Sequence, residues 1–259
     1  MSKIDQIIND LTLEEKVSLL SGFNSWYTNK IDRKGIPSIK MSDGPNGVRG
    51  DSNSGKSSAC FPCAISISSS WDLDQVKKIG VALGEEAQAK DVDVLLGPTI
   101  NIHRHPLGGR HFESFSEDPF LTGKIASSYV QGVQSQNVAA CLKHFVGNDT
   151  EFERHSISSN IDEQTLREIY LLPFEIGVKE GNAKVVMSAY NKLNNIYCSS
   201  HQEILIDILK KEWGFDGYVV SDWGAALETE ENANGGLDLE MPGPGNVWGN
   251  ALIDAIKNK

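Results

Sequence analysis

Short apolar runs alternate with amphipathic helical segments along most of this chain, and this alternation limits the possible folds more than any other feature. Apolar runs that can form strands cover 37–41, 92–96, 138–142, 184–189, 218–220 and 237–240. Segments with helical periodicity cover 72–90, 120–136, 163–180, 203–213 and 247–257. Strands that are apolar on both faces, with helices between them, indicate a parallel sheet covered on both sides.

A helix also precedes the first strand. Thr12 and Glu15 stand at the two positions of a capping box, and Gly22 ends the segment. The chain of 259 residues is therefore predicted as one large domain or slightly more, of the α/β class.

Polar residues stand at the ends of several apolar runs. They are Asp43, Lys143–His144, Tyr190–Asn191, Asp222 and Glu240. An open doubly wound sheet gathers its ligand at one switch point, whereas a barrel of about eight strand–helix units directs residues from many strands to one rim. This pattern favours a (β/α)8-like TIM barrel. The clear strands fall one or two short of a full barrel, so the expectation includes a barrel that is incomplete at the C-terminus.

Charge and hydropathy narrow the possible partners. The formal net charge is −11, which argues against nucleic acid or an anionic membrane and suits a neutral substrate. No apolar stretch approaches the roughly 20 residues that span a bilayer. The first residues, MSKIDQ, lack the apolar region of a secretory signal, so a cytoplasmic location is expected, with secretion left open if the N-terminus is incomplete.

Asp222 and Trp223 follow the run 217–221 directly. A carboxylate at the end of a barrel strand suits a nucleophile or a base, and the indole can serve as an apolar platform for a sugar face. The alternative is a helix N-cap formed by Ser221 and Asp222.

Lys143 and His144 end another run. Adjacent residues of a regular strand point to opposite faces, so both reach one site only if the strand end is distorted. The alternatives are a surface lysine beside a core histidine, or a Schiff-base lysine as in aldolases.

Arg110 follows two glycines, and a guanidinium in such a loop can bind a pair of hydroxyls or a carboxylate. The alternative is an ion pair within the loop, with Glu113, Glu117 or Asp118.

Residues 50–57 (GDSNSGKS) match the phosphate-loop pattern letter for letter. A real phosphate loop follows a strand and begins a helix, whereas Pro62 here would break the first turns. Cys60 and Cys63 are interpreted as small buried hydrophobic residues, and His103 and His105 as loop packing. No metal and no cofactor are expected.

Five ordered segments resemble glycoside hydrolase family 3. They are 43–49 (DGPNGVR), 109–119 (GRHFESFSEDP), 143–145 (KHF), 187–191 (MSAYN) and 220–223 (VSDW). Segment 237–244 (LDLEMPGP) also resembles β-glucosidases of this family, notably those of yeasts and other fungi. The resemblance covers nearly the whole chain.

This resemblance implies a barrel domain over residues 1–259 that hydrolyses terminal non-reducing β-D-glucosyl residues with retention. It implies that Asp222 is the nucleophile. The implied sugar-binding residues are Asp43, Arg49, Arg110, Lys143, His144, Arg154, Met187, Tyr190 and Trp223. The cationic residues among them, such as Lys143 and Arg110, are expected to keep Asp222 ionised.

One departure concerns the second carboxyl group, which a retaining mechanism needs roughly 5 Å from the first. The resemblance implies that this glutamate comes from a C-terminal α/β sandwich domain, which we expect to be absent here. A branch with an Asp–His acid/base pair on a barrel loop fits poorly, because 146–155 lacks that pair. The alternatives are a β-xylosidase, a related exo-glycosidase, or a catalytically incomplete sugar-binding fragment.

Overall fold

The computed structural model describes residues 2–50 and 56–258. Its helices are α1 (Lys3–Asp10), α2 (Leu13–Leu19), α3 (Ala64–Ser68), α4 (Leu73–Ala89), α5 (Pro119–Gln134), α6 (Glu163–Thr165), α7 (Leu172–Lys179), α8 (Thr229–Gly235) and α9 (Asn250–Lys257). Its strands are β1 (Met41–Ser42), β2 (Val94–Leu95), β3 (Ala139–Phe145), β4 (Ser158–Ser159), β5 (Val185–Ser188), β6 (Lys192–Leu193), β7 (Ile196–Tyr197) and β8 (Tyr218–Ser221). π-helical turns occupy Leu166–Leu171, between α6 and α7, and Glu203–Glu212.

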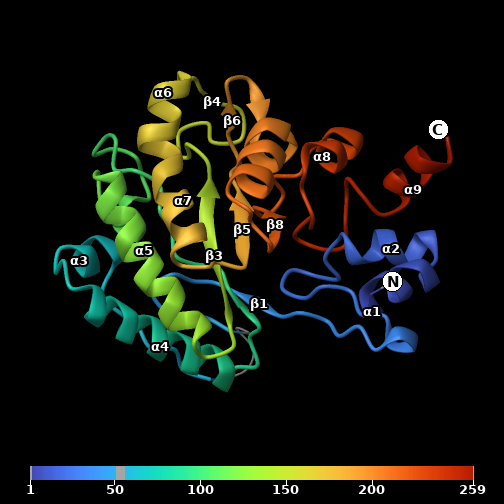
Figure 1. Ribbon diagram of the computed structural model, residues 1–259, viewed down its shortest axis with the longest axis horizontal. Coiled ribbons are helices and arrows are strands. Elements are labelled where there is room, and N and C mark those ends of the chain that lie inside the picture. The colour runs from blue at the N-terminus through green and yellow to red at the C-terminus, as the bar shows by residue number, and fades with distance from the viewer. Residues whose placement is uncertain (1, 51–55, 259) are drawn as a thin grey trace.

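A parallel sheet in the order β1-β2-β3-β5-β8 is the centre of the molecule (Figure 1). Beyond β8, Leu239 pairs with Val220, and Glu240 pairs with Ser21. After Ser21, near the N-terminus, the chain forms a short hairpin. The second arm of this hairpin pairs with Lys40, directly before β1. Hydrogen-bonded segments therefore run in a ring from β1 round to β1, which confirms the barrel-like α/β prediction.

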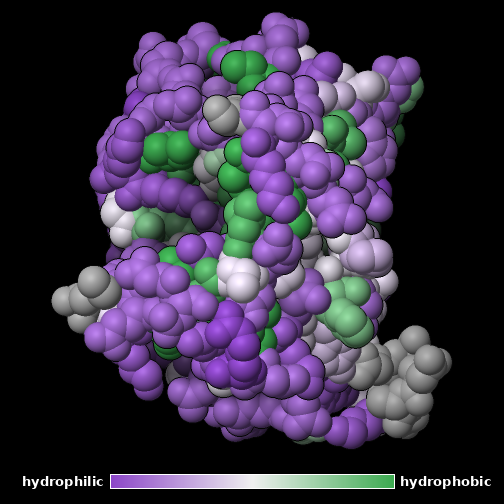
Figure 2. All heavy atoms as spheres, turned by 90° about the vertical axis from the view of Figure 1, so that its right-hand side faces the viewer, coloured by the Kyte–Doolittle hydropathy of each residue, from purple (hydrophilic) through white to green (hydrophobic). Residues whose placement is uncertain are grey.

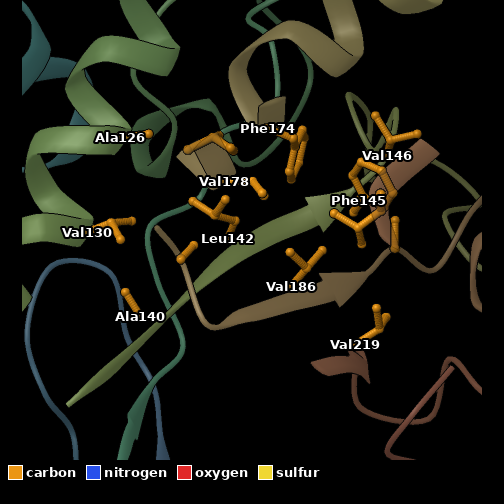
Figure 3. Close-up of a cluster of buried hydrophobic side chains, with 14 of the residues drawn as sticks. Ala126, Val130, Ala140, Leu142, Phe145, Val146, Phe174, Val178, Val186 and Val219 are labelled. Atoms are coloured by element: carbon orange, nitrogen blue, oxygen red, sulfur yellow. The ribbon is translucent and has the colours of Figure 1, made fainter. Parts of the chain in front are cut away.

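The two faces of this sheet bury two separate sets of side chains. Leu142, Val186 and Val219 point outward to the helices, where Phe145 meets Phe174 edge to face at 4.9 Å (Figure 3). The alternate residues fill the barrel interior, and they are Met41, Val94, Leu96, Cys141, Val185, Met187, Val220, Leu239 and Met241. Both faces are apolar, as the continuous apolar runs predict.

Helices α5 and α7 pack against β3, and α4 packs against α5 and β2, while α1, α2 and α9 lie together near both termini (Figure 1). Two glycines let α4 and α5 approach closely, since a Cβ on Gly132 would lie 2.8 Å from the Cα of Gly80. The face that carries the N-terminal helices is mainly hydrophilic, with hydrophobic side chains visible in its hollows (Figure 2). Within the two described ranges we find no helix long and apolar enough to cross a membrane.

Most of the predicted elements are present. Both halves of the Thr12–Glu15 capping box are formed at α2, and each predicted strand has residues in the ring. The sequence patterns did not predict α1, α3 and α8. They also did not predict the β6–β7 hairpin, although Asn194 and Asn195, with φ of 49° and 74°, supply the positive dihedrals that a tight hairpin turn needs.

Two further predictions concern the segment after β1. Residues 51–55 of the phosphate-loop pattern lie outside the described residues. From Lys56 to Cys63 the chain is not helical, so no helix begins at Lys56. The prediction that both cysteines are buried is wrong, because Cys60 is exposed and Cys63 is half-buried.

Glu240 has a structural role and does not add to the polar rim that the sequence pattern predicts. Its side chain is buried, and Oε1 accepts hydrogen bonds from the backbone N–H groups of Asn246 at 2.8 Å and Val247 at 2.9 Å. Oε2 accepts from the N–H of Trp248 at 3.0 Å and the hydroxyl of Ser21 at 3.3 Å. This carboxylate therefore holds the loop that follows the last paired segment of the ring.

We expect Glu240→Ala to lower the free energy of unfolding by about 3 kcal/mol, because hydrogen bonds to a charged acceptor contribute roughly 1.5–3 kcal/mol each. Urea denaturation measures the change, and Glu85→Ala on the exposed face of α4 is the control. Equal stability of the two variants would show that the loop does not depend on Glu240.

Candidate active site

Asp222 lies at the carboxyl end of β8, where β5 and β8 end side by side with Ser188 opposite Ser221. Its backbone N–H donates to the carbonyl of Ser188 at 3.1 Å, so the residue continues the sheet. The next helix, α8, begins only at Thr229, and the N-cap alternative for Asp222 is therefore wrong.

The two carboxylate oxygens of Asp222 have different surroundings. Oδ1 accepts a hydrogen bond from the N–H of Trp223 at 2.8 Å. Oδ2 is buried and has no hydrogen-bond partner among the described residues. The side chain is only 11% exposed, so the site around it is nearly closed. Within this site one carboxylate oxygen is held by a hydrogen bond and the other is not.

Lys143 and His144 both face this site because β3 is irregular at its end. The register between β3 and β5 shifts between Leu142 and Phe145. Lys143 Nζ lies 3.3 Å from Asp43 Oδ1, and His144 Nε2 lies 3.5 Å from Asp222 Oδ2. A distortion of this kind is what two adjacent strand residues need in order to reach one site.

Burial and charge act in opposite directions on the two central groups. Burial raises the pKa of Asp222, although Lys143, the N–H of Trp223 and Arg110 oppose the rise. Cationic neighbours such as Lys143 and Arg110 are expected to keep Asp222 ionised, and both groups do oppose the rise that burial causes. Burial, followed by the charges of Lys143, Arg110 and Arg154, holds the pKa of His144 well below its usual value, so the imidazole is neutral.

Two of the three predicted arginines, Arg110 and Arg154, reach the site from separate loops. Arg110 pairs closely with Glu113, as the ion-pair alternative proposes, and its Nη1 lies 4.0 Å from Glu151 Oε1. Arg154 donates to Glu151 Oε2 at 2.6 Å, so Glu151 joins the loops that follow β2 and β3. The guanidinium of Arg154 also stacks 4.4 Å from the centre of the Tyr190 ring.

The aromatic wall contains Tyr190 and Trp223. The Tyr190 hydroxyl donates to the carbonyl of Trp223 at 3.0 Å. Burial and the charge of Asp222 raise the pKa of Tyr190, so its proton is retained. Trp223 packs 5.5 Å from Trp26 of the N-terminal hairpin, and Met187 lies in the barrel interior against which Trp223 packs.

Arg49 is the predicted residue least integrated into this cluster. It is exposed, and it lines a cavity of about 440 Å³ between the loops after β1 and β2, together with Arg110 and Phe112. Its backbone N–H donates to the carbonyl of Asp43 at 2.6 Å, which ties its position to the end of β1.

Three further residues at the site were not singled out by the sequence patterns. They are Asn101, Glu151 and Trp26. A signal existed for Asn101, because it is a polar residue shortly after a predicted strand. Trp26 gave no signal, because only the closing of the ring brings it beside Trp223. In residues 2–50 and 56–258 no group of three His, Cys, Asp or Glu side chains could hold a metal ion.

The family model described as the glycosyl hydrolase family 3 N terminal domain matches residues 2–241. A β-glucosidase of Rhizobium radiobacter is 54% identical over 256 residues, which make up 98% of this chain and 31% of that protein. The thermostable β-glucosidase B of Acetivibrio thermocellus is 48% identical over 98% of this chain and 35% of its own length.

Solved structures agree. The β-glucosidase from Kluyveromyces marxianus in complex with glucose matches with a TM-score of 0.95 at 46% identity, over 98% of this chain and 31% of that one. β-Glucosidase 3B from Thermotoga neapolitana in complex with glucose matches with a TM-score of 0.94 at 41% identity, over 99% of this chain and 40% of that one. The chain thus spans about a third of the length of the relatives it matches. On this family match and these identities, it belongs to glycosyl hydrolase family 3.

Proposed function

We propose that this chain supplies the nucleophile and the sugar-binding subsite of a retaining exo-β-glucosidase. The observation that carries the proposal is the asymmetry of Asp222, whose Oδ1 is fixed by a backbone N–H while Oδ2 has no hydrogen bond. Oδ2 attacks the anomeric carbon and forms an ester as the bond to the leaving group breaks. The leaving group departs with the electron pair, as a retaining mechanism requires.

Charged side chains around Asp222 bind the hydroxyl groups of the sugar. Asp43 accepts hydrogen bonds and Lys143 donates them, and their ion pair fixes both side chains. Arg110 and Arg154 are held by Glu113 and Glu151 and donate from the two loops. His144 lies beside the nucleophile.

The remaining predicted residues shape the walls of the subsite. Tyr190 keeps its proton and lies next to the nucleophile, while Trp223 offers an indole face against which a sugar ring can pack. Met187 supports this wall from within the barrel, and Arg49 lines the neighbouring cavity.

Glucose is the sugar that the comparisons favour. The relatives from Rhizobium radiobacter and Acetivibrio thermocellus are named β-glucosidases, and the solved structures from Kluyveromyces marxianus and Thermotoga neapolitana are complexes with glucose. This chain spans about a third of the length of such relatives. Hydrolysis of glucosides by a longer protein that contains this chain is therefore part of the proposal.

The acid/base carboxyl group is proposed to come from a C-terminal α/β sandwich domain. The carboxylates of Glu113 and Glu151 already form ion pairs with Arg110 and Arg154. This chain alone is therefore proposed to form the glycosyl ester only with leaving groups that need no proton.

Asp222→Asn is expected to abolish covalent trapping by 2-deoxy-2-fluoro-β-D-glucosyl fluoride, because an amide cannot form the glycosyl ester. Fluoride leaves without a proton donor, so the experiment does not depend on an acid/base group. Intact-mass measurement detects one added sugar per chain in the unchanged protein. Asp216→Asn, on an exposed side chain at the other end of β8, is the matched control and should be trapped normally.

Two outcomes would contradict the proposal. An unchanged chain that is never labelled, even with a C-terminal domain supplied from a relative, would favour a binding protein without catalysis. Faster labelling by the corresponding xylosyl fluoride would contradict the assignment to glucose.

The rate of trapping is expected to rise with pH and then level off, because protonated Asp222 cannot attack. Since burial raises the pKa of Asp222, the midpoint should lie above the usual aspartate value of about 3.9. Stopped samples taken across a pH series and analysed by mass spectrometry give this midpoint. A midpoint at or below that value would show that Asp222 is not the titrating nucleophile.

Lys143→Met is expected to lower the trapping rate by roughly 10²–10³, the usual cost of one lost donor at a developing charge. It should also raise the pH midpoint, because Lys143 is the strongest of the groups that lower the pKa of Asp222. Lys184→Met is the control, since Lys184 forms a similar ion pair with Asp216 on the surface. Equal effects of the two substitutions would argue against a role for Lys143.

A further inference from the structure

Asn101 lies against the end of β3 because the chain after β2 runs beside it. The N–H of Ile100 donates to the carbonyl of Lys143 at 2.7 Å, and Thr99 forms a parallel bridge with Lys143. This pairing brings the side-chain amide of Asn101, a buried residue, next to His144.

The orientation of this amide is set by the backbone of His144. Asn101 Nδ2 donates to the carbonyl of His144 at 2.9 Å, and Asn101 Oδ1 accepts from the N–H of His144 at 2.9 Å. Turning the amide over would place N–H against N–H and oxygen against oxygen. The two backbone contacts therefore leave one orientation.

The imidazole then has one tautomer that fits. His144 Nδ1 lies 3.2 Å from Asn101 Oδ1, an oxygen that can only accept, so Nδ1 must carry the hydrogen. With the ring neutral, Nε2 has a lone pair and no hydrogen. That lone pair faces Asp222 Oδ2, 3.5 Å away, which also has no hydrogen-bond donor.

We propose that Asn101 is a positioning residue that fixes His144 as the Nδ1–H tautomer, so that Nε2 is an acceptor that faces Asp222. This proposal deepens the proposed function. The tautomer follows from the geometry alone, and only its consequence for catalysis rests on the proposed function. Without a hydrogen on Nε2, His144 cannot donate a hydrogen bond to the Asp222 carboxylate. A hydroxyl group of the sugar can donate to Nε2 when it enters.

The charges around His144 support the neutral ring. Lys143 on β3, Arg110 on the loop after β2 and Arg154 on the loop after β3 all oppose a second proton. Asp222, after β8, is the one acidic group recorded in contact with the ring within the described part of the chain. Removing Asn101 leaves this carboxylate to draw the hydrogen to Nε2.

The test is ¹⁵N NMR of the full chain labelled at histidine, with His144 assigned by His144→Gln. The Nδ1 and Nε2 shifts and their couplings to the ring protons distinguish the two tautomers and the imidazolium. We expect the unchanged protein to show neutral Nδ1–H imidazole at neutral pH, because the pKa of His144 is lowered. We expect Asn101→Ala to shift the ring towards the Nε2–H form.

The matched control is Asn194→Ala. Asn194 brackets the backbone of Ile161 in the same way, with bonds of 2.9 Å and 3.0 Å, and has no histidine in this arrangement. It should leave the His144 signals unchanged. Nε2–H or imidazolium in the unchanged protein, or Nδ1–H retained in Asn101→Ala, would overturn the proposal.

Asn101→Asp is the second variant, and it nearly preserves the shape of the side chain. It tests the contact between residue 101 and Nδ1 of His144 if Asn101→Ala does not fold. A carboxylate at Nδ1 should raise the titration midpoint of His144 by about 1–3 pH units. An unchanged midpoint would overturn the proposal. NMR reads the tautomer of His144 directly and does not depend on catalysis. If the unchanged protein shows the Nδ1–H tautomer but is not trapped covalently, that result contradicts only the proposed function.

Discussion

The break in register at the end of β3 is the feature on which the site depends. In a regular strand, Lys143 and His144 would point to opposite faces. The shift between Leu142 and Phe145 instead turns both towards the rim, while Phe145 returns to the helix side and packs on Phe174. Phe145, packed on Phe174 beyond the irregular part of β3, thus stabilises the strand end that carries Lys143 and His144.

Burial of Asp222 is balanced by a fixed set of donors and cations. A fully desolvated carboxylate would be protonated, and a fully solvated one would be a weak nucleophile. Lys143, Arg110 and the N–H of Trp223 limit the rise in pKa that burial causes. Their own counter-ions, Asp43 and Glu113, keep these cations in place.

The ring of paired segments decides which side chains belong to the rim. The interior below it is filled by alternate apolar residues, so only the last residues of each segment can contact a ligand. The N-terminal hairpin brings Trp26 beside Trp223 and pairs its two arms with the ends of the ring. Glu240 reaches the same end of the ring, but its carboxylate is used to bind the backbone of the following loop.

Local patterns in the sequence are enough to predict the order of strands and helices and the α/β class. They also predict the strand ends that carry Asp43, Lys143, His144 and Asp222, because alternation and periodicity are local properties. The folded structure was needed to show that Glu240 is structural, that Asp222 is not a helix cap, and that Asn101 contacts His144. It was also needed for the net direction of the pKa shift of Asp222. These outcomes depend on burial and on partners distant in the chain, and a carboxylate has the same letter in the sequence whether it meets a sugar, a cation or a row of backbone N–H groups.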